Sequence, residues 1–251
     1  MAAPLTETVI QRIRDQITSG ALGPGSRLPS ESELAAELGA SRNTVREAVR
    51  ALVTARVLDV RRGDGTFVTS LRPDLLLGGV GAAMDLIEEG FSLEVVGVRR
   101  ILEPAATALA AARVDDATLS ELAACLERMR QAGSEAERIQ HDAAFHRLVA
   151  DSSGNATLAS MLNAVSSRTI RARAWRGVLD EDSRSRTLVQ HDDILRALRA
   201  RDATRAQAAA LVHVATTESW FRDGVDDRFR TAGRVVEAVT ARVPRDGRTR
   251  R

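Results

Sequence analysis

The stretch Leu28–Leu34, with the sequence LPSESEL, opens the segment that decides the fold of the first part of the chain. Ser30 is followed three residues later by Glu33, which is the spacing of a capping box at the start of a helix. This pattern predicts a helix that runs to Leu38 and is closed by a tight turn at Gly39-Ala40.

A second helix is expected directly after this turn. Ser41 is a preferred N-cap residue, and the helix is predicted to run from Arg42 to about Ala55. A short helix, a glycine turn and a second helix form the arrangement of a helix-turn-helix. The apolar residues that recur at helical spacing and give the second helix a buried face are Val45, Val49 and Leu52.

The opposite face of the second helix carries residues that suit DNA in its first turns. These residues are Arg42, Asn43, Thr44 and Arg46. In a helix-turn-helix, the first turns of the second helix contact base edges and phosphates in the major groove. We expect the two arginines to contact guanine edges or phosphates, and the other two residues to support them.

Two short strands with a glycine turn between them are predicted next. LDVRR (58–62) and TFVT (66–69) flank Gly63-Asp64-Gly65, which has the composition of a hairpin turn. A hairpin behind a helix-turn-helix is a wing, with Arg62 at its tip, and the lack of a side chain on Gly63 allows close approach to a sugar-phosphate edge. The alternative for the whole segment is a small α+β subdomain with an ordinary solvated basic face.

Residues 5–72 resemble the winged-helix domain of the GntR family of bacterial transcription regulators. The chain departs from the family at Ala40, where the family favours valine, and at Arg56, where it favours glycine. The resemblance implies that Arg27 holds the DNA backbone and that the wing reaches the minor groove through Arg62, Gly63 and Gly65. The matching motifs are GSRLPSE (25–31), SRNTVREA (41–48) and GDGTFV (63–68).

The composition favours helices in the rest of the chain. The 251 residues suit two domains. Hydrophobic residues make up 44% of the chain and aromatic residues only 3%, which favours helices packed through small side chains over a β-sandwich. The formal net charge is only +2, so the placement of the arginines, and not the global charge, indicates DNA binding.

The compartment is expected to be the cytoplasm. No apolar run approaches the roughly 18 residues of a membrane span, and the N-terminus enters a predicted helix without a signal peptide. The single Cys125 has the spacing of a buried core residue and cannot form an internal disulfide, consistent with a reducing compartment. We therefore expect no membrane partner.

The chain is predicted to be mainly α, with three parts. Residues 1–72 form the winged helix-turn-helix domain of class α+β, and Leu71-Arg72-Pro73 breaks the pattern as a linker. Residues 73–235 are predicted to form an all-α helical-bundle effector and dimerisation domain of about six or seven amphipathic helices. Residues 236–251 are a basic tail that is expected to be disordered.

Four histidines carry most of the chemistry in the helical part. Asp142 and His146 are four residues apart, which places a carboxylate and an imidazole on one face of a helix, one turn apart. His191 and His213 lie on two further predicted helices, whereas His141 points away from Asp142. Such a set is what a bundle needs to converge on a metal, although a histidine beside an apolar helix face is more often an ordinary core or surface group.

From about Val98 onward, the chain is similar to the all-helical effector domain of the FadR-like branch of this family, the FCD domain. The resemblance implies that the four family metal positions are filled by Asp142, His146, His191 and His213. The matching residues are RRILE (99–103), DAAFH (142–146), Asn155, QHD (190–192) and His213. A divalent transition metal is implied, Zn²⁺ in the first place, with Ni²⁺, Mn²⁺ or Fe²⁺ as alternatives that these ligands also accept.

Arg99 has two interpretations. In the family, the arginine at this place lies near the ligand pocket, where a guanidinium can bind a carboxylate bidentately. Arg99 and Glu103 are also four residues apart, so they can form an ordinary ion pair on the helix surface.

Together these features predict a ligand-responsive transcription regulator, expected to be a repressor. It would bind a palindromic DNA operator as a homodimer, because one recognition helix contacts only a few base pairs. A small organic or sugar acid is the expected effector, completing the metal shell beside Arg99. One alternative is a direct metal sensor. The other is a metal-dependent hydrolase, for which Glu218 is the nearest acid-base candidate.

Overall fold

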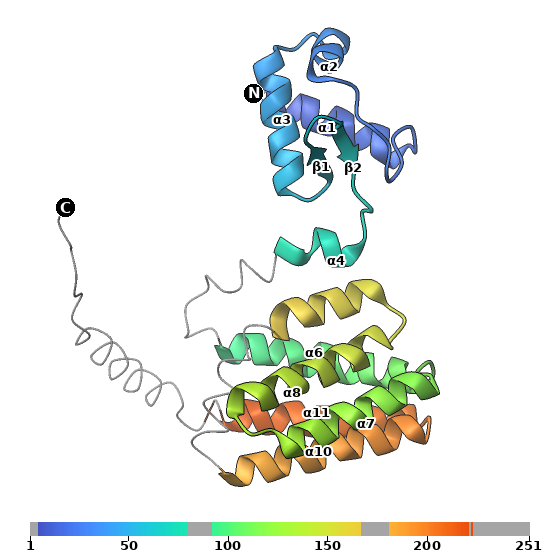
Figure 1. The fold of residues 1–251 in the computed structure, drawn as a ribbon, viewed down its shortest axis with the longest axis vertical. Coiled ribbons are helices and arrows are strands. Elements are labelled where there is room, and N and C mark those ends of the chain that lie inside the picture. Colours follow the sequence, from blue (N-terminus) through green and yellow to red (C-terminus); the bar gives the residue numbers. More distant parts are fainter. Residues whose placement is uncertain (1–4, 80–91, 167–180, 221, 223–251) are drawn as a thin grey trace, which may run out of the picture. The chain divides into compact units, whose positions relative to one another are not determined.

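The computed structural model describes residues 5–79, 92–166, 181–220 and 222, and the predicted tail 236–251 lies outside the described residues. The chain divides into two compact units, Met1–Ala82 and Ala83–Arg251, which are described separately. Figure 1 shows a mixed unit at the N-terminal end and a helical unit after it.

The first unit is a winged helix-turn-helix, as predicted. Its helices are α1 (Leu5–Thr18), α2 (Glu31–Leu38), α3 (Arg42–Thr54) and the short α4 (Pro73–Leu76), and its strands are β1 (Leu58–Arg61) and β2 (Gly65–Val68). The strands are antiparallel, with Leu58 opposite Val68 and Arg61 opposite Gly65. The core of this unit includes Val9, Ile13, Leu34, Val45, Val49, Leu52 and Leu58.

Capping residues set the ends of α2 and α3. The Ser30 side chain accepts a hydrogen bond from the Glu33 amide, and the Glu33 side chain accepts one from the Ser30 amide, so the predicted capping box is present. Gly39 has φ 61°, the left-handed conformation that suits glycine after a helix. Ser41 accepts a hydrogen bond from the Thr44 amide at 3.1 Å and begins α3.

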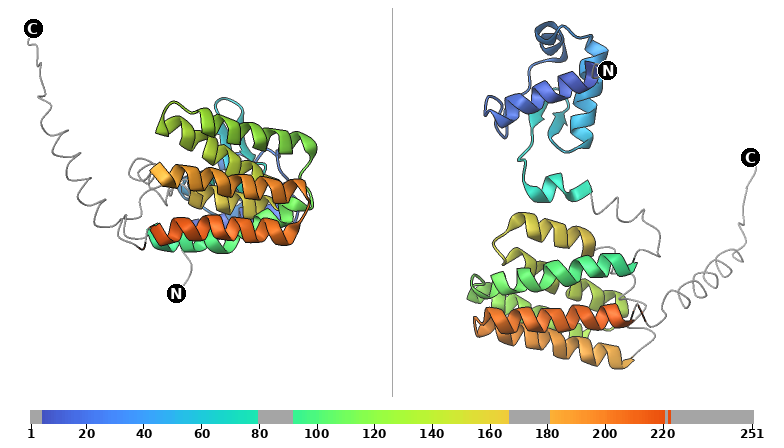
Figure 2. Two further views of the ribbon diagram at one scale, coloured as in Figure 1. Left: turned by 90° about the horizontal axis from the view of Figure 1, so that it is seen from below. Right: turned by 180° about the vertical axis from the view of Figure 1, so that it is seen from behind.

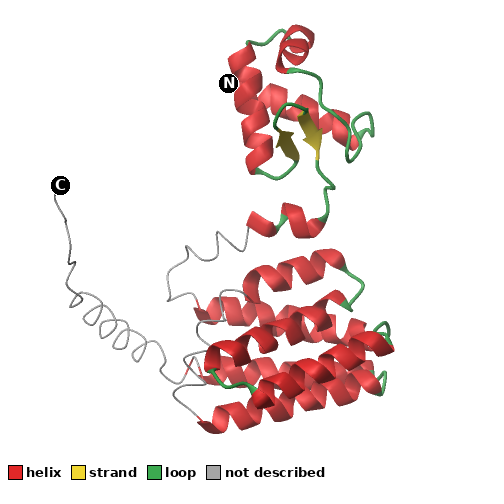
Figure 3. Cartoon of the chain, in the orientation of Figure 1, coloured by secondary structure: helices red, strands yellow, loops and turns green. Residues whose placement is uncertain are grey.

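The second unit is a bundle of helices, and its described residues contain no strand (Figure 3). Its core includes the aliphatic side chains of several helices together with Cys125, which is buried as predicted. The named helices are α6 (Ser92–Ala111), α7 (Asp116–Gln131), α8 (Glu135–Asp151), α10 (Glu181–Arg199) and α11 (Ala203–Trp220), and residues 156–166 are also helical.

The packing of these helices decides which side chains can meet. Helix α6 packs against α11, α8 and α10, and α10 packs against α11 and α7. The two views of Figure 2 show α6, α8, α10 and α11 running alongside one another. Residues carried by these four helices, which are far apart in sequence, therefore converge inside the bundle. In the described part of the chain, no helix is long and apolar enough to cross a membrane.

Candidate functional site

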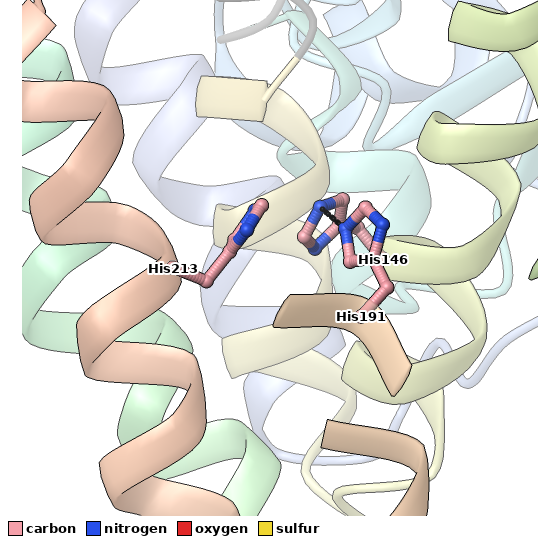
Figure 4. Close-up of side chains that lie close together, drawn as sticks. All are labelled: His146, His191 and His213. Atoms are coloured by element: carbon pink, nitrogen blue, oxygen red, sulfur yellow. Dashed lines mark hydrogen bonds between the residues drawn. The ribbon is translucent and has the colours of Figure 1, made fainter. Parts of the chain in front are cut away.

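Three histidines from three helices meet in the interior of the second unit (Figure 4). His146 lies on α8, His191 on α10 and His213 on α11, and one ring nitrogen of each lies within 4.8 Å of the others. The Nε2 atoms of His146 and His191 are 3.1 Å apart. All three residues are buried. The three predicted histidines are therefore brought together by the fold.

Asp142 lies beside two of these histidines. Its Oδ1 is 3.7 Å from Nε2 of His146 and 3.5 Å from Nε2 of His191. The carboxylate comes from α8, one helical turn before His146, and it is buried. His141, the residue before it, is only half-buried and does not belong to the cluster of three histidines.

Two of the rings hold their Nδ1 atoms against acceptors to which the sequence analysis assigned no contact with a histidine. Nδ1 of His146 lies 2.7 Å from Oε1 of Glu103. Nδ1 of His213 lies 3.2 Å from Oε1 of Gln190, whose Nε2 donates to Thr216 at 2.8 Å. Because a carboxylate and an amide oxygen can only accept, both rings donate from Nδ1 and direct Nε2 elsewhere.

The charges around the cluster shift the pKa values of its groups. Burial lowers the pKa of His146, but Glu103 and Asp142 outweigh it and raise that pKa. Burial, together with His191 and His146, holds the pKa of His213 well below its ordinary value. Burial would raise the pKa of Glu103, yet Arg99 and His146 hold it well below its ordinary value. The site thus combines a neutral imidazole, His213, with two carboxylates, Glu103 and Asp142, that stabilise positive charge on His146.

These residues fit a divalent transition metal. Nε2 of His213 is buried and has no hydrogen-bond partner among the described residues, so a lone pair is available inside the protein. Two nitrogens bound at about 2.0–2.1 Å to one tetrahedral Zn²⁺ lie roughly 3.3 Å apart, close to the 3.1 Å between His146 and His191. The cluster offers imidazole nitrogens and lies beside a carboxylate oxygen, and it contains no thiolate. Such ligands accept Zn²⁺, Ni²⁺, Mn²⁺ or Fe²⁺.

Arg99 lies next to this cluster and is fully buried. Its Nε and Nη2 atoms lie 3.0 and 2.8 Å from Oε2 of Glu103. The pair with Glu103 is therefore formed, but the expectation of a pair on the helix surface is wrong, because α6 turns this face into the bundle. A small cavity beside the cluster is lined by Glu103, Thr107, His146, Leu162, Asn163 and Ser166.

The predicted DNA-contacting residues of α3 differ in their environment. Arg42 and Asn43 are exposed, whereas Thr44 is half-buried and shares a 2.8 Å hydrogen bond with the Ser41 cap. Arg46 is paired with Glu31 of α2, with Nε and Nη2 at 3.0 and 2.9 Å from Oε2. That pair remains partly open to solvent and raises the pKa of Arg46.

The wing brings the remaining predicted residues together. Arg62 and Gly63 are exposed between β1 and β2, and Gly63 has φ 77°. Gly65 has φ 128°, and a Cβ at this position would lie 2.8 Å from Nε of Arg27. The glycine therefore lets the exposed Arg27 side chain lie directly against the wing.

Glu218, the acid-base candidate of the hydrolase alternative, is already engaged in ion pairs. It lies 3.2 Å from Nη1 of Arg100 and 2.6 Å from Nη2 of Arg222. No interaction of Glu218 with the three histidines is seen among the described residues.

Known proteins resemble both units. Residues 5–68 match the bacterial regulatory proteins of the gntR family, and residues 94–216 match the FCD domain. The galactonate operon transcriptional repressor of Escherichia coli (strain K12) is 30% identical over 219 residues, covering 84% of this chain and 94% of that protein. The HTH-type transcriptional regulator LutR of Bacillus subtilis (strain 168) is 30% identical over 207 residues, covering 80% and 94%.

A solved structure agrees with these relatives. Streptococcus agalactiae GntR superposes with a TM-score of 0.64 at 28% identity, over 85% of this chain and 99% of that one. The relatives are transcriptional regulators and not enzymes, so the hydrolase alternative is wrong. The chain belongs to the gntR family of bacterial regulatory proteins, and it is a transcriptional regulator that joins a DNA-binding helix-turn-helix to an FCD domain.

Proposed function

We propose that this regulator is a repressor that binds a palindromic operator as a homodimer and responds to a small carboxylate through a metal-containing pocket. The observation that carries the proposal is the convergence of His146, His191 and His213, with Asp142 beside them, inside the domain that is joined to the DNA-binding head. The relatives include several proteins that are named repressors.

In the DNA-binding head, α3 and the wing supply the contacts. Arg42 and Arg46 would contact guanine edges or phosphates, with Asn43 and Thr44 supporting them. Arg27 would hold the backbone, and the wing would reach the minor groove through Arg62, Gly63 and Gly65. The exposure of Arg42, Asn43, Arg62 and Gly63 supports this assignment.

In the effector domain, His146, His191, His213 and Asp142 would hold the metal, with Zn²⁺ expected first and Ni²⁺, Mn²⁺ or Fe²⁺ as alternatives. When bound, the metal supplies a Lewis-acid site with open positions for an anionic oxygen. Arg99, which lies beside the cluster, would neutralise the part of the effector's negative charge that the metal does not. A small organic or sugar acid fits this chemistry, and one relative is named for a galactonate operon.

The exposed side chains of α6 and α11 support the homodimer. These two helices pack against each other. Several large apolar side chains on them are exposed, whereas the exposed side chains of most neighbouring helices are mainly charged. Apolar surface of this kind marks an interaction face, and a twofold operator needs a second copy of this chain. The residues concerned are Val98, Ile101, Leu109, Leu211 and Val212.

The dimer is tested by adding a charge to this face. Ile101→Arg should shift the molecular mass in light scattering toward the monomer and weaken operator binding, because Ile101 is 73% exposed. Val189→Arg is the control, since Val189 is 59% exposed but lies on α10. If Ile101→Arg leaves the dimer intact, the face is not the interface.

The effector site is tested by thermal shift of the metal-loaded protein against small carboxylates, repeated after chelation. An effector at about 100 times its dissociation constant should stabilise the protein by about 2.7 kcal/mol. Loss of this shift on chelation, and in His191→Ala, would support a metal-bound acid. If chelation alone changes operator affinity and no acid shifts the melt, the regulator senses the metal itself. Unchanged metal content in His191→Ala would refute the site.

A further inference from the structure

Glu103 is a buried carboxylate whose two oxygens serve two different partners. It lies on α6, and its side chain is only 8% exposed. Oε1 is 2.7 Å from Nδ1 of His146, and Oε2 accepts from Nε of Arg99 at 3.0 Å. Glu103 thus joins Arg99 to a histidine of the cluster.

The contact with His146 decides which ring nitrogen faces the cluster. Because a carboxylate only accepts hydrogen bonds, Nδ1 of His146 must carry the proton. Nε2 then faces Nε2 of His191 at 3.1 Å and Oδ1 of Asp142 at 3.7 Å. A histidine that binds a metal generally donates its other N–H to such a partner, which fixes the tautomer and the orientation of the ring and raises its basicity.

Glu103 differs from the acceptor that holds the neighbouring ring. His213 donates Nδ1–H to Gln190, which is a neutral amide. Glu103 brings a full negative charge, and a buried carboxylate is costly unless it is paired. The fully buried Arg99 provides that pairing through Nη2, which lies 2.8 Å from Oε2. Arg99 therefore allows a charged acceptor, and not merely a neutral one, to lie behind His146.

We propose that Glu103 is a positioning residue of the metal centre: it fixes the His146 ring with Nε2 toward the metal, while Arg99 holds the Glu103 carboxylate in place. This inference rests on the proposed metal site. It assigns Glu103 a role in metal affinity as the acceptor for His146, whereas a carboxylate that only stabilises the bundle through its pair with Arg99 would leave metal affinity unchanged.

The decisive comparison uses two double variants that lack Arg99 and differ only at Glu103. Removing one partner of a buried pair leaves the other charge uncompensated, whereas replacing both together is often tolerated. In Arg99→Met with Glu103→Gln, the amide oxygen still accepts from Nδ1 of His146. In Arg99→Met with Glu103→Met, a side chain of similar length offers no acceptor. Zn²⁺ affinity is measured by competition with a chelator, and the site geometry by the absorption of bound Co²⁺.

The variant with methionine at both positions should bind Zn²⁺ about 10- to 100-fold more weakly than the variant with glutamine at 103. Its Co²⁺ spectrum should also differ from that of the wild type, whereas glutamine should restore the spectrum. If the wild type binds metal but the two variants have equal affinities and spectra, the role of Glu103 is overturned and the proposed metal site is not. A wild type that binds no metal through its histidines would overturn the proposed site as well.

A second measurement needs no substitution at Glu103. In the Zn²⁺-loaded wild type, the ¹⁵N shifts of the His146 imidazole should show a protonated Nδ1 and a metal-bound Nε2. His146→Ala identifies the resonances. Metal bound at Nδ1 of His146 would overturn the inference, because Glu103 would then lie on the wrong side of the ring.

Discussion

Arg56 adopts a left-handed backbone conformation that suits glycine and that arginine rarely adopts. It has φ 59° two residues after the end of α3, at the position where the family resemblance led us to expect glycine. The left-handed conformation costs an L-residue roughly 1–2 kcal/mol, although glycine recovers only part of this because it is more flexible when unfolded. The departure seen in the sequence is therefore a site of local strain at the entry to the wing.

Relief of this strain should be measurable by chemical denaturation. Arg56→Gly should be more stable than Arg56→Ala by about 1 kcal/mol, because both lose the guanidinium and only glycine accepts a positive φ without strain. The 2.8 Å hydrogen bond from Thr69 to the Arg56 carbonyl can form in both variants. Equal stability of the two variants would mean that the backbone here changes conformation at no cost.

Arg46 is predicted to bind DNA even though it is paired with Glu31. Arg46→Ala should weaken operator binding roughly 10-fold, the size of a lost base or phosphate contact, and should leave the melting temperature nearly unchanged because the pair is open to solvent. Arg50→Ala is the control, since Arg50 is an exposed arginine further along α3 and is paired with Glu47. A large fall in melting temperature would instead make Arg46 structural.

The proposed metal ligands can be predicted from the sequence more completely than the residues that contact them. The spacing of Asp142 and His146 is local, so it is visible without a fold. The convergence of three helices was an inference from residue chemistry and family resemblance. For Glu103, the sequence indicates a match to the family motif and a partner for Arg99 but not the contact with His146, because spacing along one helix cannot show that α6 buries this face or which nitrogen of His146 lies opposite.

The contribution of the α3 N-cap to stability follows from its hydrogen-bond geometry. Ser41 accepts from the Thr44 amide at 3.1 Å, and this bond satisfies one of the free amides at the start of the recognition helix. Ser41→Ala should lower the free energy of unfolding by about 1 kcal/mol. It should also weaken operator binding, because the first turn of α3 carries Arg42 and Asn43.

The free energy of unfolding of the first unit is measured by denaturing the full chain, and Ser32→Ala is the matched control. Ser32 is an exposed serine within α2 and is not an N-cap. Alanine has the higher helix propensity, so this variant should be equal to or more stable than the wild type. The assignment of Ser41 fails if the two substitutions have the same effect.

Helices and caps can be predicted from the sequence because their determinants are local, whereas the border between the two units has no such local determinant. The pattern break at Leu71-Arg72-Pro73 predicts a linker, and Pro73 is also the first residue of α4. Proline suits the first turn of a helix as well as a break. The two units divide after Ala82, and this division depends on tertiary contacts that spacing does not reveal.

For the whole molecule, the proposed mechanism requires reciprocal coupling between its two units. An effector that weakens operator binding must itself bind more weakly to the operator complex, by the same factor. A regulator whose metal is structural should keep the metal in both states. A direct metal sensor should instead release or bind the metal as the operator affinity changes.

Metal removal and pH should act together on the stability of the folded protein. Without metal, the protonated ring of His146 stabilises the folded state, because its pKa is raised above the ordinary 6.5. That contribution is complete below pH 6.5 and is lost as pH rises through the raised pKa. Metal binding requires an unprotonated ring, so its contribution grows over the same range. His213, whose pKa is lowered well below 6.5, is already neutral there.

The difference in melting temperature between Zn²⁺-loaded and chelated protein should therefore increase as pH is raised from about 5.5 to about 8. His191→Ala should abolish most of this difference at every pH, because it removes a proposed ligand. His141→Ala is the control: it lies on the same helix as His146 but outside the cluster, so it should behave as the wild type. A Zn²⁺ effect that is independent of pH, or that persists in His191→Ala, would place the metal elsewhere on the chain.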